Sequence, residues 1–237
     1  MGRRLFDIGA ATAALIVLSP LMLLVAIAIR MSSAGPVIFR APRVGLHGRL
    51  FSMFKFRTML AVTGEAGSAI TGNRDPRVYP LGRLLRRSKI DELPQLLNVL
   101  RGEMALVGPR PEDPGMVAAW YRAEHQSTLD VRPGLASPGS LYNFTHGEVQ
   151  LAGPDAEAAY IERVLPVKLA LDVVYVRRAS FGYDLTVVLR TLFVIVAAGL
   201  GKRRFGEPPE MAEALELATG TPARARAAPR SQPDGVL

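Results

Sequence analysis

The chain has 237 residues, a length that predicts one domain, or one domain with a membrane element. It carries 29 Lys and Arg residues against 21 Asp and Glu residues, which gives a formal net charge of +8. Because it contains no cysteine, a disulfide framework and a cysteine-ligated metal site are both excluded.

The first predicted element is an uncharged apolar helix from Ile8 to Ile29, which is long enough to cross a bilayer. It is too long for the apolar part of a signal peptide, and no small-residue cleavage site ends it, so we interpret it as a retained anchor. Ser19 and Pro20 interrupt this helix at its centre. Pro20 leaves the carbonyl of Ile16 without a helical partner, and the Ser19 hydroxyl can bond back to a carbonyl one turn earlier.

Two topologies fit the interrupted helix: a kinked helix that spans the bilayer, or a re-entrant helix that breaks and returns to the same face. Arg3 and Arg4 precede the apolar run, and Arg30, Arg40 and Arg43 follow it. Since both ends are cationic, the positive-inside rule gives no clear asymmetry for a crossing. The flanking charge therefore favours the re-entrant helix, with both chain termini on the cytoplasmic side.

The region that begins with this helix is basic. Between Asp7 and Glu65 there is no acidic residue, whereas arginine and lysine recur through the window. A basic region beside an apolar anchor indicates contact with anionic lipid headgroups or with phosphate-bearing substrates. Nucleic acid is a disfavoured partner, because the chain has neither an RNA-binding aromatic signature nor a DNA-binding motif.

The elements after the anchor are short. A Gly-Pro turn leads to a strand at 37–40, and residues 48–59 read as a second extended segment, so we predict a short strand pair within 36–57. Residues 61–75 are polar and glycine-rich and predict a loop. Residues 79–104 predict a helix with one apolar face, formed by Leu93, Leu96, Leu97 and Leu100.

The remaining segments are predicted in this order: a Pro/Gly loop from Leu106, a helix over 116–125, a loop-rich stretch over 131–148, and a helical segment over 156–178 that Pro166 kinks or divides. The apolar stretch 184–201 contains Arg190, which favours a helix lying at the membrane interface over a simple span. The tail is rich in Pro, Ala and Arg and predicts disorder. The predicted organisation is a membrane helix at 1–32, a domain at 33–205 and a disordered tail at 206–237.

The stretch RRSKIDELPQ contains the residues best suited to catalysis in this chain. Asp91 and Glu92 are adjacent carboxylates at the predicted start of an amphipathic helix, just after Arg86 and Lys89. The local pattern by itself favours helix capping, because Ser88-x-x-Asp91 matches a capping box and acids favour helix N-termini. The alternative is phosphoryl transfer, in which one carboxylate attacks phosphorus and the other holds Mg²⁺. Nearby cations would keep the attacking carboxylate ionised and offset the phosphoryl charge.

Further cations stand in restricted contexts. Arg110 lies in GPRP and Arg132 in VRPG, where a proline-flanked guanidinium suits bidentate phosphate contact, although a surface arginine in a turn fits equally well. Lys55 and Arg57 alternate with two phenylalanines, so they form either the solvent face of a half-buried strand or a cationic face turned toward an active site. No phosphate-binding glycine-rich loop appears, and the histidines lack metal-ligand spacing.

Several motifs, taken in order, resemble one family over residues 3 to about 200: RRLFDI, the anchor with Ser-Pro, GPVIFR, KFRTM, LGRLLRRSKIDELPQLLNVLRGEMALVGPRPE and VRPG. The chain resembles the bacterial sugar transferases that load a phosphosugar onto polyprenol phosphate, in their small monotopic form. We therefore predict an α+β, mainly helical fold. A re-entrant N-terminal membrane helix would carry a small catalytic domain on the cytoplasmic face of the bacterial inner membrane, with interface helices near 184–200.

The resemblance implies transfer of a sugar-1-phosphate from a nucleotide-diphosphate sugar, usually a UDP-sugar, to undecaprenyl phosphate, which gives undecaprenyl-diphosphate sugar and UMP. It implies that Asp91 is the nucleophile, forming a phosphosugar-aspartyl intermediate, and that Glu92 coordinates Mg²⁺. With the cationic face considered above, the predicted substrate- and phosphate-binding residues are Lys55, Arg57, Arg86, Arg110 and Arg132.

One region departs from the family pattern. After VRPG many members read Ile/Leu-Thr-Gly and then an Ala- or Trp-Gln-Val segment, where this chain has LASPGSLYNFTHGE. We expect that region to contribute to the nucleotide or sugar site, so the resemblance does not carry the sugar over. The rival hypothesis is a membrane-bound basic scaffold that binds anionic lipid or partner enzymes and tolerates loss of both carboxylates. The sugar, the pathway and the oligomeric state, a homodimer included, stay open.

Overall fold

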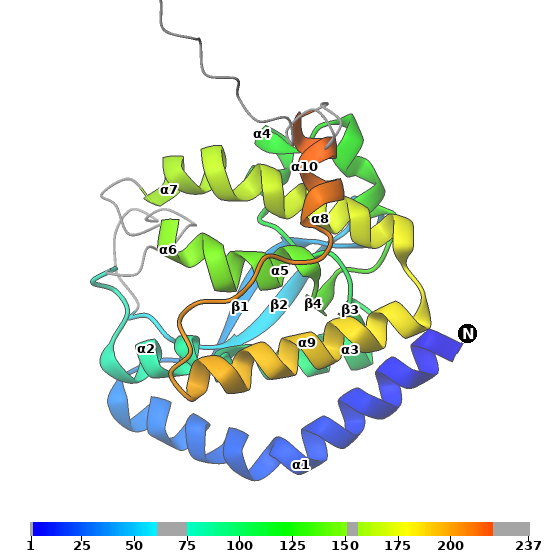
Figure 1. Ribbon diagram of the computed structural model, residues 1–237. Coiled ribbons are helices and arrows are strands. Elements are labelled where there is room, and N and C mark those ends of the chain that lie inside the picture. Colours follow the sequence, from blue (N-terminus) through cyan, green and yellow to red (C-terminus); the bar gives the residue numbers. More distant parts are fainter. Residues whose placement is uncertain (1, 61–74, 151–155, 220–237) are drawn as a thin grey trace, which may run out of the picture.

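The computed structural model describes residues 2–60, 75–150 and 156–219, and the description below is confined to them. Helices dominate, and they surround two small two-stranded sheets (Figure 1), so the predicted α+β, mainly helical class is confirmed. The elements are α1 (Gly2–Ser32), β1 (Ile38–Val44), η1 (Leu46–Gly48), β2 (Leu50–Phe56), α2 (Pro80–Arg87), η2 (Ile90–Glu92), α3 (Gln95–Arg101), β3 (Ala105–Val107), α4 (Pro114–Trp120), η3 (Ala123–Leu129), β4 (Gly134–Ala136), α5 (Pro138–Tyr142), η4 (Asn143–Gly147), α6 (Glu148–Gln150), α7 (Ala156–Ala159), η5 (Tyr160–Val164), α8 (Leu165–Arg178), α9 (Phe181–Gly199) and α10 (Met211–Thr219).

Helix α1 is one element with Pro20 inside it, and it is bent in its middle, with an arm rising on either side of the bend (Figure 1). The Ser19 hydroxyl donates to the carbonyl oxygen of Ile16 over 2.8 Å. That carbonyl is the one that Pro20, having no N–H, leaves without its helical partner. The predicted compensation of the proline by the neighbouring serine is confirmed.

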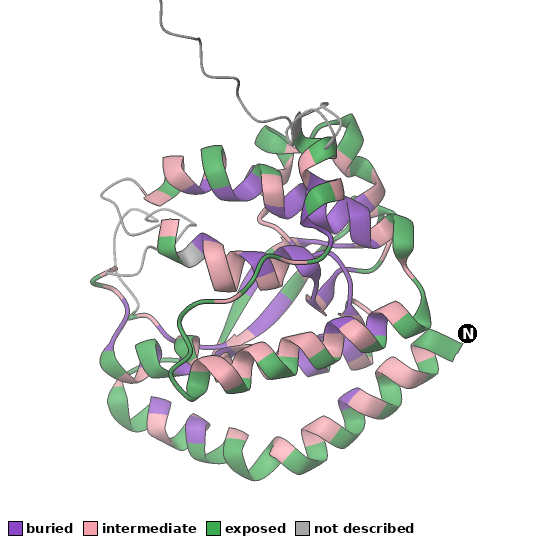
Figure 2. Cartoon of the chain, viewed as in Figure 1, coloured by how far each residue is buried: buried purple, intermediate pink, exposed green. Residues whose placement is uncertain are grey.

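Both arms of α1 pack on the same domain, whereas the bend does not. Ala11 in the first arm is fully buried in a cluster with Leu96 of α3, and Ile29 in the second arm is fully buried in a cluster with Phe56 of β2. Between the arms lie exposed apolar side chains: Ile16, Val17, Leu21, Leu23 and Leu24. Figure 2 shows the corresponding exposure along the outer face of the helix.

Polar contacts fasten both ends of α1 to the domain. At the N-terminal end, Arg4 donates to the last carbonyls of α3, and Arg3 pairs with Asp184 at the start of α9 over 2.5 Å. At the other end, Arg57 donates to the carbonyls of Ser33 and Ala34, which directly follow the helix. Arg3 and Arg4, which in the sequence only marked a cationic flank, therefore bind one end of the helix to the domain, and Arg57 binds the other.

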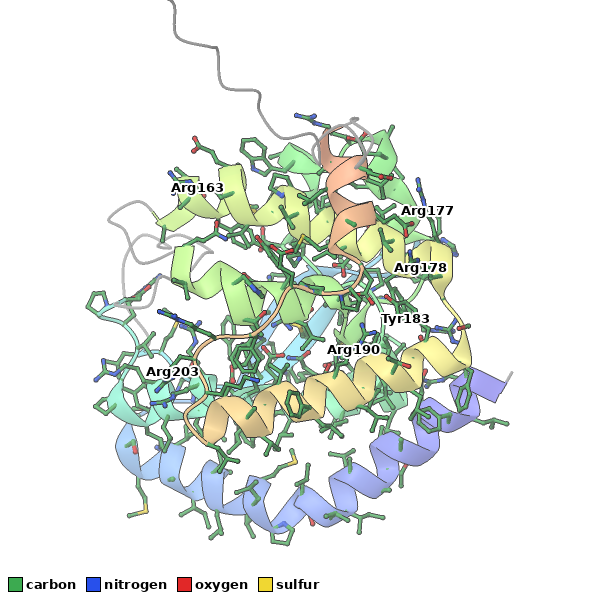
Figure 3. The ribbon with its side chains drawn as sticks, viewed as in Figure 1. Arg163, Arg177, Arg178, Tyr183, Arg190 and Arg203 are labelled. Atoms are coloured by element: carbon green, nitrogen blue, oxygen red, sulfur yellow. The ribbon has the colours of Figure 1, made fainter. Side chains whose placement is uncertain are left out.

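Helix α9 is, with α1, one of two described helices long and apolar enough to cross a membrane. Its Arg190 and Tyr183 both donate to the buried carboxylate of Glu210, over 2.6 and 2.7 Å, from the side that faces the segment leading to α10 (Figure 3). Its apolar side chains are exposed instead, among them Leu185, Leu189, Leu192, Phe193 and Val196. The helix thus has a protein-facing polar side and an exposed apolar side, and its position at a membrane interface stays a prediction.

The predicted strand pair within 36–57 is confirmed, because β1 and β2 pair antiparallel with Ile38 opposite Phe56. The predicted division of the segment 156–178 is also confirmed. The π-helix η5 precedes α8, which begins at Leu165 with Pro166 in its first turn. The N–H groups of a first turn have no acceptor within the helix, so a proline there costs no helical hydrogen bond.

Three sequence predictions are corrected by the fold. Residues 131–148 are not loop-rich, since they contain α5, η4 and strand β4, which pairs parallel with β3. The helix predicted over 79–104 is divided into α2, η2 and α3. The tail prediction differs over 206–219, because α10 buries Met211 and Ala214 in the cluster around α8. Short strands and a nine-residue helix carry too little local signal to stand out from the composition around them. Residues 61–74 and 220–237 lie outside the described residues.

Candidate active site

The adjacent carboxylates lie in a turn between two helices. Lys89 adopts a left-handed backbone conformation (φ 58°, ψ 13°), and the 3₁₀ turn η2 that carries Asp91 and Glu92 begins directly after it. A non-glycine residue held in this region costs roughly 1–3 kcal/mol, and such strain clusters at functional sites. The strained turn separates α2 from α3 and presents the carboxylates toward strand β2.

The capping interpretation of this stretch is wrong. The Ser88 hydroxyl donates back to the carbonyls of Leu84 and Leu85, over 2.9 and 3.1 Å, and makes no cap for the following turn. Asp91 is only 5% exposed, and its Oδ1 atom has no hydrogen-bond partner among the described residues. A buried polar atom without a partner costs roughly 1–3 kcal/mol. A carboxylate that served only to cap a helix would not leave this oxygen unsatisfied.

Glu92 is held by cations from two other elements. Arg110 donates through Nη1 to Oε2 over 3.0 Å and through Nη2 to Oε1 over 2.7 Å, which makes a bidentate pair. Lys55 of β2 donates through Nζ to Oε1 over 3.3 Å. Burial by itself raises the pKa of Glu92, but the charges of Arg110, Lys55 and Lys89 outweigh it and hold that pKa well below its usual range. Glu92 is therefore a fixed anion.

Asp91 behaves in the opposite way. Burial, followed by the negative charge of Glu92, raises the pKa of Asp91, while Lys55, Lys89 and Arg86 act against that rise. The cations were expected to favour the ionised form of the attacking carboxylate, but at Asp91 burial outweighs them, and it is the pKa of Glu92 that they hold down. The pair thus offers one carboxylate whose oxygens are engaged and one with a buried oxygen that has no hydrogen-bond partner among the described residues.

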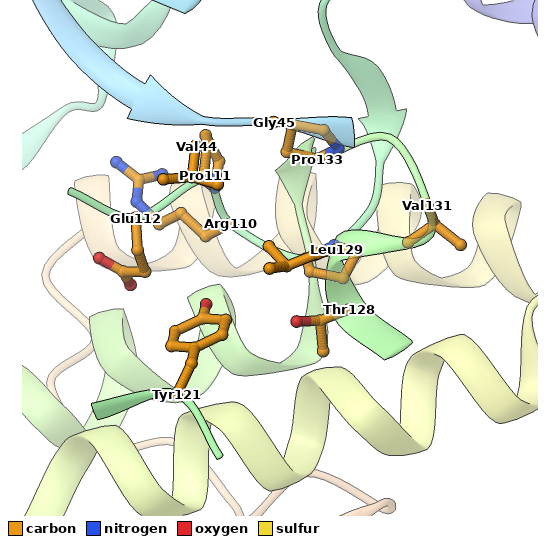
Figure 4. Close-up of a pocket in the computed structure, with 11 residues that line it drawn as sticks. Val44, Gly45, Arg110, Pro111, Glu112, Tyr121, Thr128, Leu129, Val131 and Pro133 are labelled. Carbon is orange, nitrogen blue, oxygen red and sulfur yellow. The ribbon is translucent and has the colours of Figure 1, made fainter. Parts of the chain in front are cut away.

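Arg110 is presented by the loop between β3 and α4. The Gly108 N–H donates to the Ala136 carbonyl and the Gly134 N–H donates to the Pro109 carbonyl, each over 2.9 Å. The two glycine backbones approach so closely that a Cβ on Gly134 would collide with the backbone of Gly108. Figure 4 shows this loop against the end of β1, beside a cavity of about 10 Å³, which is room for about one water.

The other predicted cations separate into three cases. Arg86, in the last turn of α2, is near enough for its charge to lower the pKa of Asp91. Arg57 is a correction: its buried guanidinium donates to Ser33 and Ala34, so it fastens α1 instead of facing the carboxylates. Arg132 donates through Nε to the carbonyl of Gly102 over 3.1 Å, at the end of α3. No hydrogen bond or ion pair among the described residues joins Arg132 to the carboxylate pair.

The sequence treated Lys89 only as a flanking charge, although it contributes to the electrostatics of both carboxylates. Its Nζ lies 4.6 Å from the ring centroid of Phe144. Phe144 belongs to the π-helix η4, inside the region where the chain departs from the family pattern. That departing region therefore borders the turn that carries Asp91. Its contribution to a sugar or nucleotide site stays a prediction.

The residues present could bind Mg²⁺ only if a substrate supplied further ligands. Two adjacent carboxylates and the unpartnered oxygen of Asp91 are ligands of the kind that Mg²⁺ prefers. No cluster of three or more His, Cys, Asp or Glu side chains that could hold a metal ion occurs in the described parts of the chain. A magnesium ion commonly uses one or two carboxylates and completes its shell with substrate phosphates and water, so the residues fit it.

Comparison with known sequences decides the family. A sequence model of the family described as bacterial sugar transferase matches residues 1–198. The chain belongs to the bacterial sugar transferase family. Among its relatives in this family is an "undecaprenyl-phosphate glucose phosphotransferase" of Komagataeibacter xylinus, 38% identical over 196 residues. Another is a "UDP-N-acetylgalactosamine-undecaprenyl-phosphate N-acetylgalactosaminephosphotransferase" of Aeromonas hydrophila, 36% identical over 203 residues.

The family relatives differ in length. The alignment covers 80% of this chain but 35% of the Komagataeibacter protein, and 85% of this chain but 45% of the Aeromonas protein. The "exopolysaccharide production protein PSS" of Rhizobium leguminosarum bv. phaseoli is 34% identical over 205 residues, which is 84% of this chain and 97% of that relative. The chain therefore spans less than half of the first two relatives and nearly all of the third.

Proposed function

We propose that this protein transfers a sugar-1-phosphate from a UDP-sugar to undecaprenyl phosphate, as the first membrane step in assembling a polysaccharide or glycoconjugate. One observation carries the proposal: a buried carboxylate oxygen of Asp91 has no hydrogen-bond partner among the described residues and adjoins Glu92, which Arg110 and Lys55 hold ionised. The names of the Komagataeibacter and Aeromonas relatives supply the acceptor lipid and two alternative sugars, glucose and N-acetylgalactosamine.

In the proposed reaction, a carboxylate oxygen of Asp91 attacks the phosphorus that bears the sugar. The bond from that phosphorus to the bridging oxygen breaks, and UMP leaves with the electron pair. A phosphate oxygen of undecaprenyl phosphate then attacks the same phosphorus and releases the Asp91 carboxylate. The two displacements balance without an added oxidant, reductant or water. Burial and the adjacent charge of Glu92 make Asp91 a stronger base than a solvated carboxylate, which suits it to attack.

The surrounding side chains supply charge where the reaction develops it. Lys55 and Arg86 lie close enough to Asp91 for their charges to lower its pKa, so they can offset the charge of the transferring phosphoryl group. Glu92 would hold the Mg²⁺ that we expect the reaction to need, which leaves the unpartnered oxygen of Asp91 for the attack on phosphorus. When bound, that ion would neutralise diphosphate charge and help orient the donor.

The membrane arrangement follows from α1. Because both arms pack on one domain and both ends are fastened to it by arginines, the structure supports a re-entrant helix whose exposed bend enters the bilayer. We place the domain on the cytoplasmic face of the inner membrane, beside the exposed apolar side of α9. The chain is free of cysteine, so single cysteines at Gly2 and Gln126, both exposed, allow clean accessibility labelling. Labelling of these two positions from opposite sides would contradict the re-entrant arrangement.

The reaction is tested with a donor panel. Membranes that contain the folded protein are incubated with undecaprenyl phosphate, Mg²⁺ and a set of UDP-sugars, and the lipid product is identified by mass spectrometry alongside UMP release. We expect one donor or a few to give an undecaprenyl-diphosphate sugar. Lipid binding without turnover of any donor would overturn the transferase and favour the basic scaffold.

A further inference from the structure

A second cluster of buried charge lies behind the loop that presents Arg110. Lys168 of α8 is 0% exposed, and its ammonium forms an ion pair with the Glu112 carboxylate, two residues beyond Arg110. The Tyr160 hydroxyl donates to the same Glu112 oxygen over 3.2 Å. Neither Glu112 nor Lys168 was a candidate from the sequence, although a lysine inside the apolar run LPVKLALDVV is an unusual core residue.

The groups facing this pair come from several elements. Burial by itself raises the pKa of Glu112, but Lys168, followed by Arg110 and by Arg43 of β1, outweighs it and lowers that pKa. Asp172, one turn along α8, and Tyr121, before η3, both act to raise the pKa of Lys168. Figure 4 shows Tyr121 with its hydroxyl directed toward the loop of Arg110 and Glu112. Lys168 is thus the fully buried central cation of this network.

The ion pair fixes the far end of the Arg110 loop. The near end is held where the Gly108 N–H meets the Ala136 carbonyl, and the backbone carbonyl of Glu112 accepts from the Val44 N–H over 3.0 Å. The prolines on both sides of Arg110 restrict the loop between these points. Lys168 lies in α8, whose apolar side chains form the largest part of one buried core cluster, so the helix holds this partner of Glu112 in place.

We propose that the Lys168–Glu112 ion pair positions Arg110 for its bidentate contact with Glu92, and that it thereby sets the turnover rate of the transferase proposed above, on which this role rests. Glu112 and Lys168 are positioning residues, since they act through Arg110 and do not touch the carboxylate pair. Buried ion pairs contribute little net stability but can fix one geometry. A misplacement of about 1 Å in such a support can cost about 100-fold in rate.

The test uses Glu112→Gln, Lys168→Met and the double variant, all in the full chain in detergent or membranes. Each single variant leaves one buried charge unpaired and should melt at a lower temperature. The double variant removes both charges, so its melting temperature should return toward that of the wild type. We expect its kcat to stay roughly 10- to 100-fold low while KM for the UDP-sugar changes less than about threefold.

A double-mutant cycle with Arg110→Lys separates positioning from general structural damage. If Glu112 acts through Arg110, Glu112→Gln should cost little further activity once Arg110 is already changed. Full additivity of the two losses, or wild-type kcat in the double variant Glu112→Gln/Lys168→Met, would overturn the proposal. Glu213→Gln is the matched control, because it breaks an exposed ion pair between Arg178 of the same helix and α10 and should leave kcat unchanged. An inactive wild type would instead refute the proposed function itself.

Discussion

The domain contains two clusters of buried charge that share one loop, and they differ in what they leave open. Around Asp91 and Glu92, an anion is held by cations while the neighbouring carboxylate keeps an unpartnered oxygen. Around Lys168, the ammonium is enclosed and paired with Glu112. An incompletely satisfied cluster is suited to bind a ligand, whereas a satisfied one is suited to fix a geometry. Arg110 and Glu112, two residues apart, connect them.

The largest expected effect on activity is at Asp91, the carboxylate with the unpartnered oxygen. Asp91→Asn removes the nucleophile and should lower the rate of UMP release by roughly 1,000-fold or more. The protein should fold normally, because the amide is nearly isosteric. The exposed Asp130→Asn serves as the matched control. Full activity in Asp91→Asn would break the distinction between the two clusters, because the unpartnered oxygen would then have no chemical role.

The enclosed cluster makes a prediction about pH. Burial raises the pKa of Asp172 to about 6, although the charge of Lys168 and hydrogen bonds from Ser137 and Gly139 act to lower it. A carboxyl whose pKa is raised by folding favours the native state when protonated, and this contribution is lost as the pH rises from about 4 to about 6. The free energy of unfolding of Asp172→Asn, relative to that of the wild type, should therefore increase by up to about 3 kcal/mol over that range. Melting temperatures from pH 4 to pH 7 measure it, and parallel curves would contradict it.

The contact between the clusters is tested by Arg110→Lys. A lysine cannot reproduce the bidentate contact with Glu92, so kcat/KM should fall roughly 10- to 100-fold, which corresponds to about 1.5–3 kcal/mol for a charged hydrogen bond. Steady-state kinetics with the preferred donor give the value. Arg122→Lys, at an exposed arginine of the same domain, provides the control. An unchanged kcat/KM would mean that the pairing with Glu92 has no part in turnover.

The smallest expected effect concerns Arg57, which lies outside both clusters. Arg57→Gln leaves the carbonyls after α1 without their donors and should destabilise the protein by about 1–3 kcal/mol. KM for the UDP-sugar should stay unchanged, because the side chain fastens the helix and does not face the carboxylates. The exposed Arg49→Gln is the control for loss of charge. A selective rise in KM, without loss of thermal stability, would restore the original prediction that Arg57 binds substrate.

The structure brings together several of the site residues that the sequence predicted, and their roles stay predictions. Lys55 and Arg110 do converge on Glu92, and Arg86 lies within electrostatic range of Asp91. The predictions for Arg57 and Arg132 have no such support, because a basic residue in a recognisable motif does not reveal which carbonyl or carboxylate its side chain will meet. The sequence also does not reveal the burial of Asp91, which raises its pKa although the cations around it act to lower it.

The sequence by itself determined the features that depend on neighbouring residues. Pro20 frees the Ile16 carbonyl and Ser19 satisfies it, the two carboxylates are adjacent in the chain, and prolines flank Arg110. Only the tertiary structure decided that both arms of α1 lie on one domain, that one carboxylate is held while the other stays open, and that Lys168 supports the loop through Glu112. Those outcomes depend on burial and on contacts between residues far apart in the chain, which local pattern does not encode.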